Sequence, residues 1–280
     1  MEAETNTGKL YIVATPIGNL KDITYRAVEI LSKVDIILCE DTKNSHKLLS
    51  HYGISTKTYP YNDHSKVQIR EKVLDLLGSG KSIALISDAG TPLISDPGFK
   101  LVKECKNNDI KVIPIPGPSA AIAALCVSGQ TTDKFYFNGF LPTKATVLQS
   151  TLTSLANIEN SMIFYESPKR IYKTVEVIYQ MMGDREIVMA REMTKIYEEF
   201  ICLKCSEFLA QYAEAQFRGE IVLIVAGKAP EQQDHNRADL RGWLTQLLAD
   251  HTLKEAVEIV RDVTKMSKKE IYQEALKLKQ

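Results

Sequence analysis

Short apolar segments alternate with amphipathic segments from the start of the chain, and this alternation restricts the possible folds more than any other feature. The apolar segments have the length of strands and are rich in β-branched and aliphatic residues, at 10–14, 36–39, 83–86 and 112–115. The segments between them have helical periodicity, at 25–34, 43–52, 66–77 and 99–107. Continuous apolar strands need cover on both faces, so the pattern predicts a parallel, doubly wound α/β sheet.

Proline and glycine are concentrated in three loops, each directly following one of these strands. The loops are 15–20 (TPIGNL), 87–98 (SDAGTPLISDPG) and 116–120 (PGPSA). Proline restricts the backbone, glycine lets it approach a ligand closely, and a helix that starts after Pro118 can receive a carboxylate. Because open α/β sheets bind ligands beyond the carboxyl ends of their strands, we predict one preorganised small-molecule pocket built from the three loops.

A second α/β segment begins near residue 135. A strand at 162–165 leads through Ser167 and Pro168, a helix cap and a first-turn proline, into a helix that ends at Gly183. Further strands are expected at 186–190, 196–203 and 219–226.

A polar segment, 227–236, reads as a linker to a helical tail. In the tail, Thr252 and Ser267 are each followed three residues later by glutamate, a capping box that marks a helix start and suggests a helix-turn-helix. The predicted organisation is an α/β protein with two α/β domains, 1–130 and 131–230, a ligand cleft between them, and a small C-terminal helical domain, 237–280.

Composition limits the partners and the compartment. The 280 residues include 35 Lys+Arg and 35 Asp+Glu, so the formal net charge is zero and any RNA contact needs locally gathered positive charge. There is no apolar run of about 18 residues and no signal-peptide pattern, so no membrane association is expected. Five cysteines, an odd number in a chain large enough to build a core, predict a reducing cytoplasm.

Several common motifs are absent from the sequence. Neither a G-x-G-x-x-G after the first strand nor a G-x-x-x-x-G-K-[ST] occurs, which removes support for a dinucleotide dehydrogenase or a P-loop NTPase. Cys202 and Cys205 form a lone C-x-x-C, and His46 and His51 are spaced too far apart to share a helical face. We predict no metal site.

Three aspartates at the predicted ligand edge have two interpretations each. Asp41 ends the second strand, and Asp88 and Asp96 flank the loop rich in glycine and proline. They can bind hydroxyls or a base, or accept a proton; they can equally cap their own loops. For Asp96, which precedes a proline, loop capping is the favoured interpretation.

The motifs together resemble the ribosomal RNA small subunit methyltransferase I family, part of the tetrapyrrole-methylase-like superfamily. The resemblance rests on the first-strand motif LYIVATPIGNL, on SDAGTPLISDPG and PGPSA, and on FYESPKR (164–170) and REMTK (191–195). It covers about residues 9–228, and the tail is similar to the C-terminal helical domain of that family.

The resemblance implies a function and a cofactor. Members transfer a methyl group from S-adenosylmethionine to the ribose 2′-hydroxyl of a cytidine in the decoding region of 16S rRNA in the small ribosomal subunit, and are usually homodimers. The cofactor lies in the cleft between the α/β domains. Residues carried over by motif to cofactor binding are Pro16, Ile17, Gly18, Asp88, Ala89, Gly90, Thr91, Ile94, Pro118, Ser119, Ala120, Tyr165 and Ile221.

Methyl transfer to a ribose hydroxyl requires in-line alignment and an acceptor for the hydroxyl proton. Glu166, Asp41 and Asp88 are the carboxylates considered for that role, without a choice among them. The basic side chains considered for phosphate binding or for stabilising the developing oxyanion are Lys169, Arg170, Arg191 and Lys195. The predicted catalytic residues are therefore Glu166, Asp41, Lys169, Arg170, Arg191 and Lys195, while Asp88 is assigned to cofactor binding.

The sequence departs from the family pattern in two segments, 41–47 and 143–147, which hold fewer basic residues than is typical there. Recognition is therefore expected to need the folded subunit. Two other functions stay open. A small-molecule methyltransferase of the tetrapyrrole type would need an apolar trough and neither the basic residues nor the tail. A ribosome assembly factor without turnover would not need three rigid loops.

Overall fold

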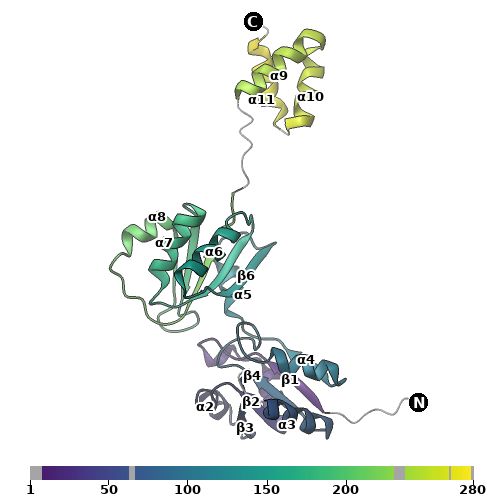
Figure 1. Ribbon diagram of the computed structural model, residues 1–280, viewed down its shortest axis with the longest axis vertical. Coiled ribbons are helices and arrows are strands. Elements are labelled where there is room, and N and C mark those ends of the chain that lie inside the picture. The colour runs from purple at the N-terminus through teal and green to yellow at the C-terminus, as the bar shows by residue number, and fades with distance from the viewer. Residues whose placement is uncertain (1–7, 63–66, 230–236, 265, 279–280) are drawn as a thin grey trace, which may run out of the picture. The chain divides into compact units, whose positions relative to one another are not determined.

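The computed structural model describes residues 8–62, 67–229, 237–264 and 266–278 (Figure 1). The chain divides into two compact units, Met1–Lys228 and Ala229–Gln280. Two separate five-stranded sheets lie within the first unit. The second unit is helical.

The first sheet is wholly parallel, as the sequence predicted, with strand order β3-β2-β4-β1-β5. Helices α1 and α2 pack on one face, and α3 and α4 pack on the other. The bounds are β1 Lys9–Val13, α1 Tyr25–Lys33, β2 Ile36–Cys39, α2 Thr42–His51, β3 Thr58–Pro60, α3 Val67–Gly78, β4 Ile83–Ile86, α4 Phe99–Asn107 and β5 Lys111–Ile115. A short 3-10 helix, η1, spans Leu20–Asp22.

The second sheet is mixed, with strand order β6-β7-β10-β8-β9. Strand β6 runs parallel to β7, and the other neighbours are antiparallel. Helices α6, α7 and α8 cover one face. The bounds are β6 Phe135–Phe140, α6 Ala145–Leu155, β7 Ser161–Glu166, α7 Ile171–Met182, β8 Glu186–Arg191, β9 Glu199–Lys204, α8 Cys205–Gln211 and β10 Ile221–Val225.

Helix α5, Ala120–Val127, covers the other face of the second sheet, although it directly follows a strand of the first. Its residues are apolar on nearly every side, and Ala124 and Leu125 pack against Ile163 and Ile224 of the second sheet. The helix therefore joins the two sheets physically. The predicted domain boundary at residue 130 comes after helix α5 in the sequence, but the sheet on which α5 packs lies after residue 130.

The differences from the expected elements are local. Strand β9 starts at Glu199, not near residue 196, because the segment before it forms a turn with Glu192 and Thr194 at positive φ. Strands β3 and β6 and helices α6 and α8 had no assignment from the sequence. Both strands are at sheet edges, where the apolar alternation is weak, and α8 is only 7 residues long.

The second unit consists of three helices around a small apolar core that includes Leu244, Val257 and Ile271. Their bounds are α9 Arg237–Asp250, α10 Leu253–Thr264 and α11 Lys268–Leu278. The capping box predicted at Thr252 is confirmed, since its amide donates to Glu255 at 2.9 Å. Most of the predicted linker, and Lys265 in the predicted turn, lie outside the described residues.

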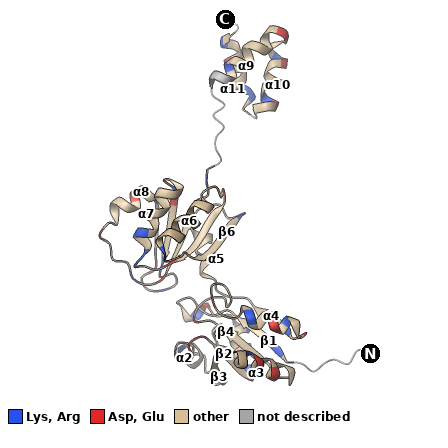
Figure 2. Ribbon diagram, viewed as in Figure 1, with Lys and Arg blue, Asp and Glu red and all other residues tan. Residues whose placement is uncertain are grey.

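Charge is mixed along the helices of the described chain: Figure 2 shows Lys and Arg interspersed with Asp and Glu on elements such as α3, α4 and α10. No described helix is both long and apolar enough to cross a membrane.

Candidate functional site

The three Pro/Gly loops meet beyond the carboxyl ends of three adjacent strands, β4, β1 and β5, as predicted. Thr15 and Gly90 exchange two backbone hydrogen bonds of 2.8 and 3.0 Å, which join the first loop to the second. The Thr91 hydroxyl donates to the Pro118 carbonyl at 3.0 Å, which joins the second loop to the third. Gly90 has φ +76°, a conformation that costs glycine little and other residues more. The loops thus form one connected wall.

A cavity of about 360 Å³ lies against this wall and is closed on its other side by the second sheet. This is the size range of small-molecule and cofactor sites. Of the predicted site residues, the structure brings the following to its lining: Ile17, Asp88, Ala89, Gly90, Thr91, Ile94, Ser119, Ala120, Tyr165, Glu166 and Ile221.

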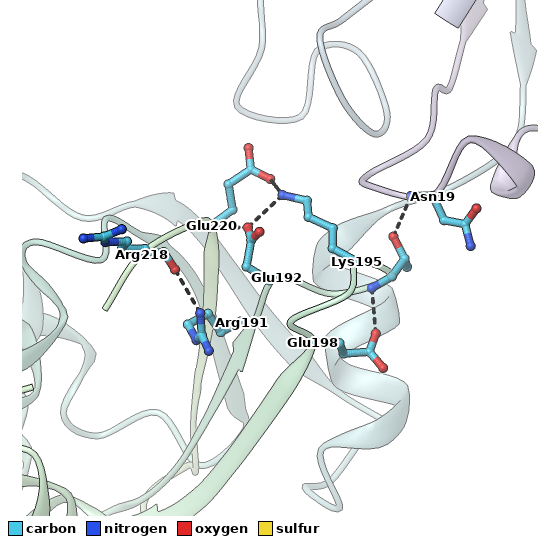
Figure 3. Close-up of polar contacts among 8 residues, drawn as sticks. Asn19, Arg191, Glu192, Lys195, Glu198, Arg218 and Glu220 are labelled. Carbon is cyan, nitrogen blue, oxygen red and sulfur yellow. Dashed lines mark hydrogen bonds and ion pairs between the residues drawn. The ribbon is translucent and has the colours of Figure 1, made fainter. Parts of the chain in front are cut away.

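Three predicted cofactor residues support the wall without lining the cavity. Pro16 lies within the first loop, and Pro118 holds the second loop through its carbonyl. Gly18 packs so closely on the loop before β9 that an added Cβ would lie 2.7 Å from Thr194 Oγ1. The amide of Asn19 donates to that hydroxyl at 3.0 Å, so this loop and its glycine connect the two sheets (Figure 3).

The cavity has the chemistry that S-adenosylmethionine requires. Apolar side chains such as Ile17 and Val222 can contact an adenosyl group, and the Asp88 carboxylate could bind the ammonium group or the ribose hydroxyls of the cofactor. At the start of α5, the Ser119 side chain makes no capping hydrogen bond among the described residues, and the helix N-terminus opens onto the cavity. Such an N-terminus favours a carboxylate, like that of a methionine moiety. The residues therefore fit the cofactor.

The Glu166 carboxylate is buried and already bonded within the protein. One oxygen accepts from the Ser167 amide at 2.6 Å, and the other from the Thr174 hydroxyl at 2.6 Å. The Arg170 guanidinium lies 3.5 Å away. These contacts orient the turn between β7 and α7.

Asp41 also has a structural role. It is the N-cap of α2, and its carboxylate accepts from the amides of Lys43 at 2.8 Å and Asn44 at 3.4 Å. Its own amide donates to the Asp88 carboxylate at 3.2 Å, so Asp41 positions Asp88, which does line the cavity.

Three of the four predicted cationic residues are held in internal contacts. Arg191 pairs with Glu199 at 2.9 Å, and the guanidinium of Arg170 donates to the carbonyls of Leu141 and Pro142. Figure 3 shows the Lys195 ammonium between Glu192 and Glu220, at 2.8 and 2.7 Å. Burial alone would lower the pKa of Lys195, but these two carboxylates outweigh it and raise that pKa.

Lys169 differs from the other three cations. It is exposed, follows two cavity-lining residues, and makes no hydrogen bond or ion pair to any other residue that the structure describes. Its ammonium is therefore available to a phosphate.

The position of Asp96 changes the interpretation that the sequence favoured, which was loop capping. It is half-buried and lines the cavity, which favours ligand binding or proton acceptance over simple loop capping. Burial and the nearby Glu40 and Asp88 carboxylates raise its pKa to about 6, although a hydrogen bond with Ser87 opposes the shift. The neighbouring Leu93 and Ser95 have φ of 72° and 65°, strained values of the kind that gather at functional sites.

Other lining residues escaped prediction. They are Ser95, Phe140, Ser167, Pro168, Met193, Gly219, Glu220 and Val222. Most of them are next in the sequence to a predicted site residue, so including the immediate neighbours of each predicted residue would have identified most of this group. Phe140 lies on an edge strand that the sequence did not reveal.

Comparison with known proteins agrees with this architecture. Residues 9–208 match the model for Tetrapyrrole (Corrin/Porphyrin) Methylases, and residues 234–279 match that for the RsmI C-terminal HTH domain. Among solved structures, a cobalt precorrin-4 methyltransferase of cobalamin biosynthesis is 16% identical with a TM-score of 0.60, over 78% of this chain and 94% of its own. A Thermus thermophilus uroporphyrin-III C-methyl transferase complexed with S-adenyl homocysteine has a TM-score of 0.57 at 13% identity, over 78% and 97%. The fold class predicted from the sequence is confirmed.

Relatives of much higher identity share one name, ribosomal RNA small subunit methyltransferase I. The protein from Vibrio cholerae serotype O1 is 46% identical over 94% of this chain and 92% of its own, and that from Escherichia coli O157:H7 is 42% identical over 98% and 96%. The Bacillus subtilis relative is 39% identical over 96% and 94%. The chain therefore belongs to the ribosomal RNA small subunit methyltransferase I family, within the tetrapyrrole methylases, and its methyl donor is S-adenosylmethionine.

Proposed function

We propose that this protein transfers the methyl group of S-adenosylmethionine to the ribose 2′-oxygen of a cytidine in the decoding region of 16S rRNA, within the small ribosomal subunit. The observation that carries the proposal is the cavity itself, which is lined by residues of the three connected loops, by the start of α5 and by the carboxylates of Asp88 and Asp96. The names of the relatives support rRNA as the substrate class.

The bound cofactor would supply a methyl group on a sulfonium, already electrophilic enough for direct transfer. The protein then has three tasks: to align the 2′-oxygen with the methyl carbon, to exclude water, and to accept the hydroxyl proton. The backbone of Ala89, Gly90 and Thr91 and the start of α5 orient the donor. Ile17, Tyr165 and Ile221 exclude water from the reacting atoms.

Asp96 is the carboxylate that we assign to proton acceptance. Glu166 and Asp41 each accept two hydrogen bonds, Asp88 accepts one from the Asp41 amide, and Asp96 is hydrogen-bonded to Ser87. Asp96 lines the cavity, and its raised pKa makes it a stronger base than an ordinary aspartate while leaving it ionised near neutral pH. Lys169 is assigned to a phosphate adjoining the target nucleotide.

Labelled methyl transfer to small subunits from cells that lack this methylation tests the function. The expected result is label in 16S rRNA, with mass spectrometry of nuclease fragments placing it on the ribose of a cytidine. Asp88→Ala should lose at least tenfold in cofactor affinity, while Asp75→Ala, an exposed aspartate on α3 away from the cavity, should behave as wild type.

Other outcomes would contradict the proposal. Label on a base, or on a different rRNA, would refute the predicted position. Label only on a porphyrin-like acceptor would support small-molecule methylation, and tight cofactor binding without any acceptor would support an assembly factor. We propose that the reaction takes place in the cytoplasm during ribosome assembly. We also propose that the protein is a homodimer, and light scattering at micromolar protein concentration should then give a mass of twice 31.4 kDa.

A further inference from the structure

Strand β6 contains a bulge that changes the direction of Phe140. Its pairing with β7 is regular up to Phe137, which lies opposite Ile163, and then shifts so that Phe140 lies opposite Tyr165. In a regular strand, Gly139 would face Tyr165 and Phe140 would point to the other side of the sheet. The extra residue therefore brings Phe140 to the face that lines the cavity, as bulges beside active sites often do.

Gly139 makes this bulge possible. It has φ +65°, and a Cβ built on it would lie 2.7 Å from the Ser95 hydroxyl in the strained loop after β4. The bulge and that loop are thus in direct contact. On the other side of Phe140, the Arg170 guanidinium donates to the carbonyls of Leu141 and Pro142 at 3.2 and 2.8 Å. The backbone around Phe140 is held from both directions.

Phe140 lines the cavity, and the residue is still 62% exposed. One neighbour is Tyr165, whose ring centroid is 5.4 Å away in an edge-to-face arrangement; Tyr165 in turn contacts Phe137 at 5.2 Å. Of the large apolar lining residues, Ile94 is the next most exposed, at 43%. A large aromatic surface left open at a rigid position beside a cavity is suited to stack on another planar ring.

We propose that Phe140 is the platform on which the base of the target nucleotide stacks when that nucleotide leaves the RNA. This inference rests on the proposed function. A 2′-oxygen can reach a methyl group inside a cavity only if its nucleotide is splayed out, which loses base stacking, and a protein aromatic side chain can replace that stacking. The exposed ring meets an incoming base before the buried lining does.

Charge makes stacking more important here than in a basic RNA-binding protein. The chain has a formal net charge of zero, and Arg191 and Lys195 near the site are in ion pairs. Non-specific phosphate attraction is correspondingly weak. Recognition then relies on contacts such as base stacking, which is tolerant of base identity and contributes roughly 5- to 100-fold per base.

Kinetics with four variants tests the proposal, using small subunits that lack the methylation as substrate and calorimetry for S-adenosylmethionine affinity. Phe140→Ala should lower kcat/KM for subunits about 5- to 100-fold and leave cofactor affinity within about twofold. Phe140→Tyr should restore most of the activity, whereas Phe140→Leu, apolar but not aromatic, should not. Phe135→Ala removes another exposed phenylalanine of β6, 43% exposed and outside the cavity lining, and should behave as wild type.

Three outcomes would overturn the proposal. Equal activity of the Leu and Tyr variants would show that apolar bulk suffices. A parallel loss of cofactor affinity in Phe140→Ala would assign the ring to the adenine of the cofactor. An equal defect in Phe135→Ala would mean that the whole strand, and not this ring, matters. Thermal unfolding of each variant verifies folding, and an inactive wild type would refute the proposed function rather than this role of Phe140.

Discussion

At the scale of single residues, the carboxylates of the site divide by their surroundings. Glu166 is a member of a motif that the sequence singled out, yet its two oxygens are bonded to Ser167 and Thr174. Asp96 was expected to cap a loop, yet it lines the cavity with a raised pKa. Sequence motifs identified the region, but the hydrogen bonds that occupy each carboxylate join residues as far as 47 positions apart, and no spacing rule supplies those.

The pKa of Asp96 predicts the pH dependence of methylation. A base has to be deprotonated, so kcat/KM should fall as pH drops through about 6, and not near 3.8, the ordinary pKa of aspartate. Asp96→Asn should remove this acid limb and lower kcat at least tenfold at pH 7.5, with cofactor affinity little changed. A wild-type profile that is flat from pH 7 to 5, or an Asn variant of full activity, would exclude Asp96 as the base.

Asp96 and Glu166 are also expected to affect stability in opposite directions. The pKa of Asp96 is higher in the folded protein than in the unfolded chain, so its ionised form costs stability above about pH 6, and this cost disappears below about pH 4. Asp96→Asn should therefore raise the free energy of unfolding at pH 7.5 by about 1 kcal/mol, after allowance for its exposed half. Glu166→Gln breaks buried hydrogen bonds and should lower it by about 1–3 kcal/mol. Denaturant titrations with shifts of the same sign would contradict this contrast.

At the scale of elements, the central strands and the loops that follow them were predictable from the sequence, whereas the edge strands β3 and β6 were not. The strands at β1, β2, β4 and β5 form continuous apolar runs, and such runs identify buried parallel strands without further information. Strand β6 has a mixed pattern because it lies at an edge and contains a bulge at Asn138 and Gly139. That bulge sets the direction of Phe140, so the sequence did not indicate this lining residue.

The loop connection at Gly90 predicts a specific defect. Gly90→Ala places a side chain at φ +76° in the residue that exchanges two hydrogen bonds with Thr15, so the loop wall should shift and cofactor affinity should fall severalfold. Gly53→Ala is the matched control, since Gly53 has φ +64° and open space around its Cβ, at the end of α2. Calorimetry should show normal affinity for that variant, although both lose about 1 kcal/mol of stability. Equal affinity in the two variants would mean that the wall does not depend on Gly90.

At the scale of the whole molecule, the two units have independent cores. The four apolar clusters of the first unit and the single cluster of the second share no residue. Helix α5 follows a strand of the first sheet and packs on the second sheet. The sequence of this helix is apolar throughout, so it carries no sign of which sheet the helix will cover.

Removal of the second unit should separate cofactor binding from action on the subunit. A chain that ends at Lys228 keeps every residue of the cavity lining, so its affinity for S-adenosylmethionine should equal that of the full chain. We propose that the helical unit contributes to recognition of the subunit, so kcat/KM for small subunits should fall at least tenfold. Filter assays with labelled donor measure both, and unchanged activity would show that the helical unit takes no part in recognition.

Hydrogen exchange with and without S-adenosylhomocysteine tests most directly whether the three loops hold one cofactor. Added at saturating concentration, this product of methyl transfer should slow amide exchange in all three segments, 15–20, 87–98 and 116–120, and leave helix α3, 67–78, unchanged. Protection of one loop only, or of none, would contradict a cofactor site formed jointly by the loops after β1, β4 and β5.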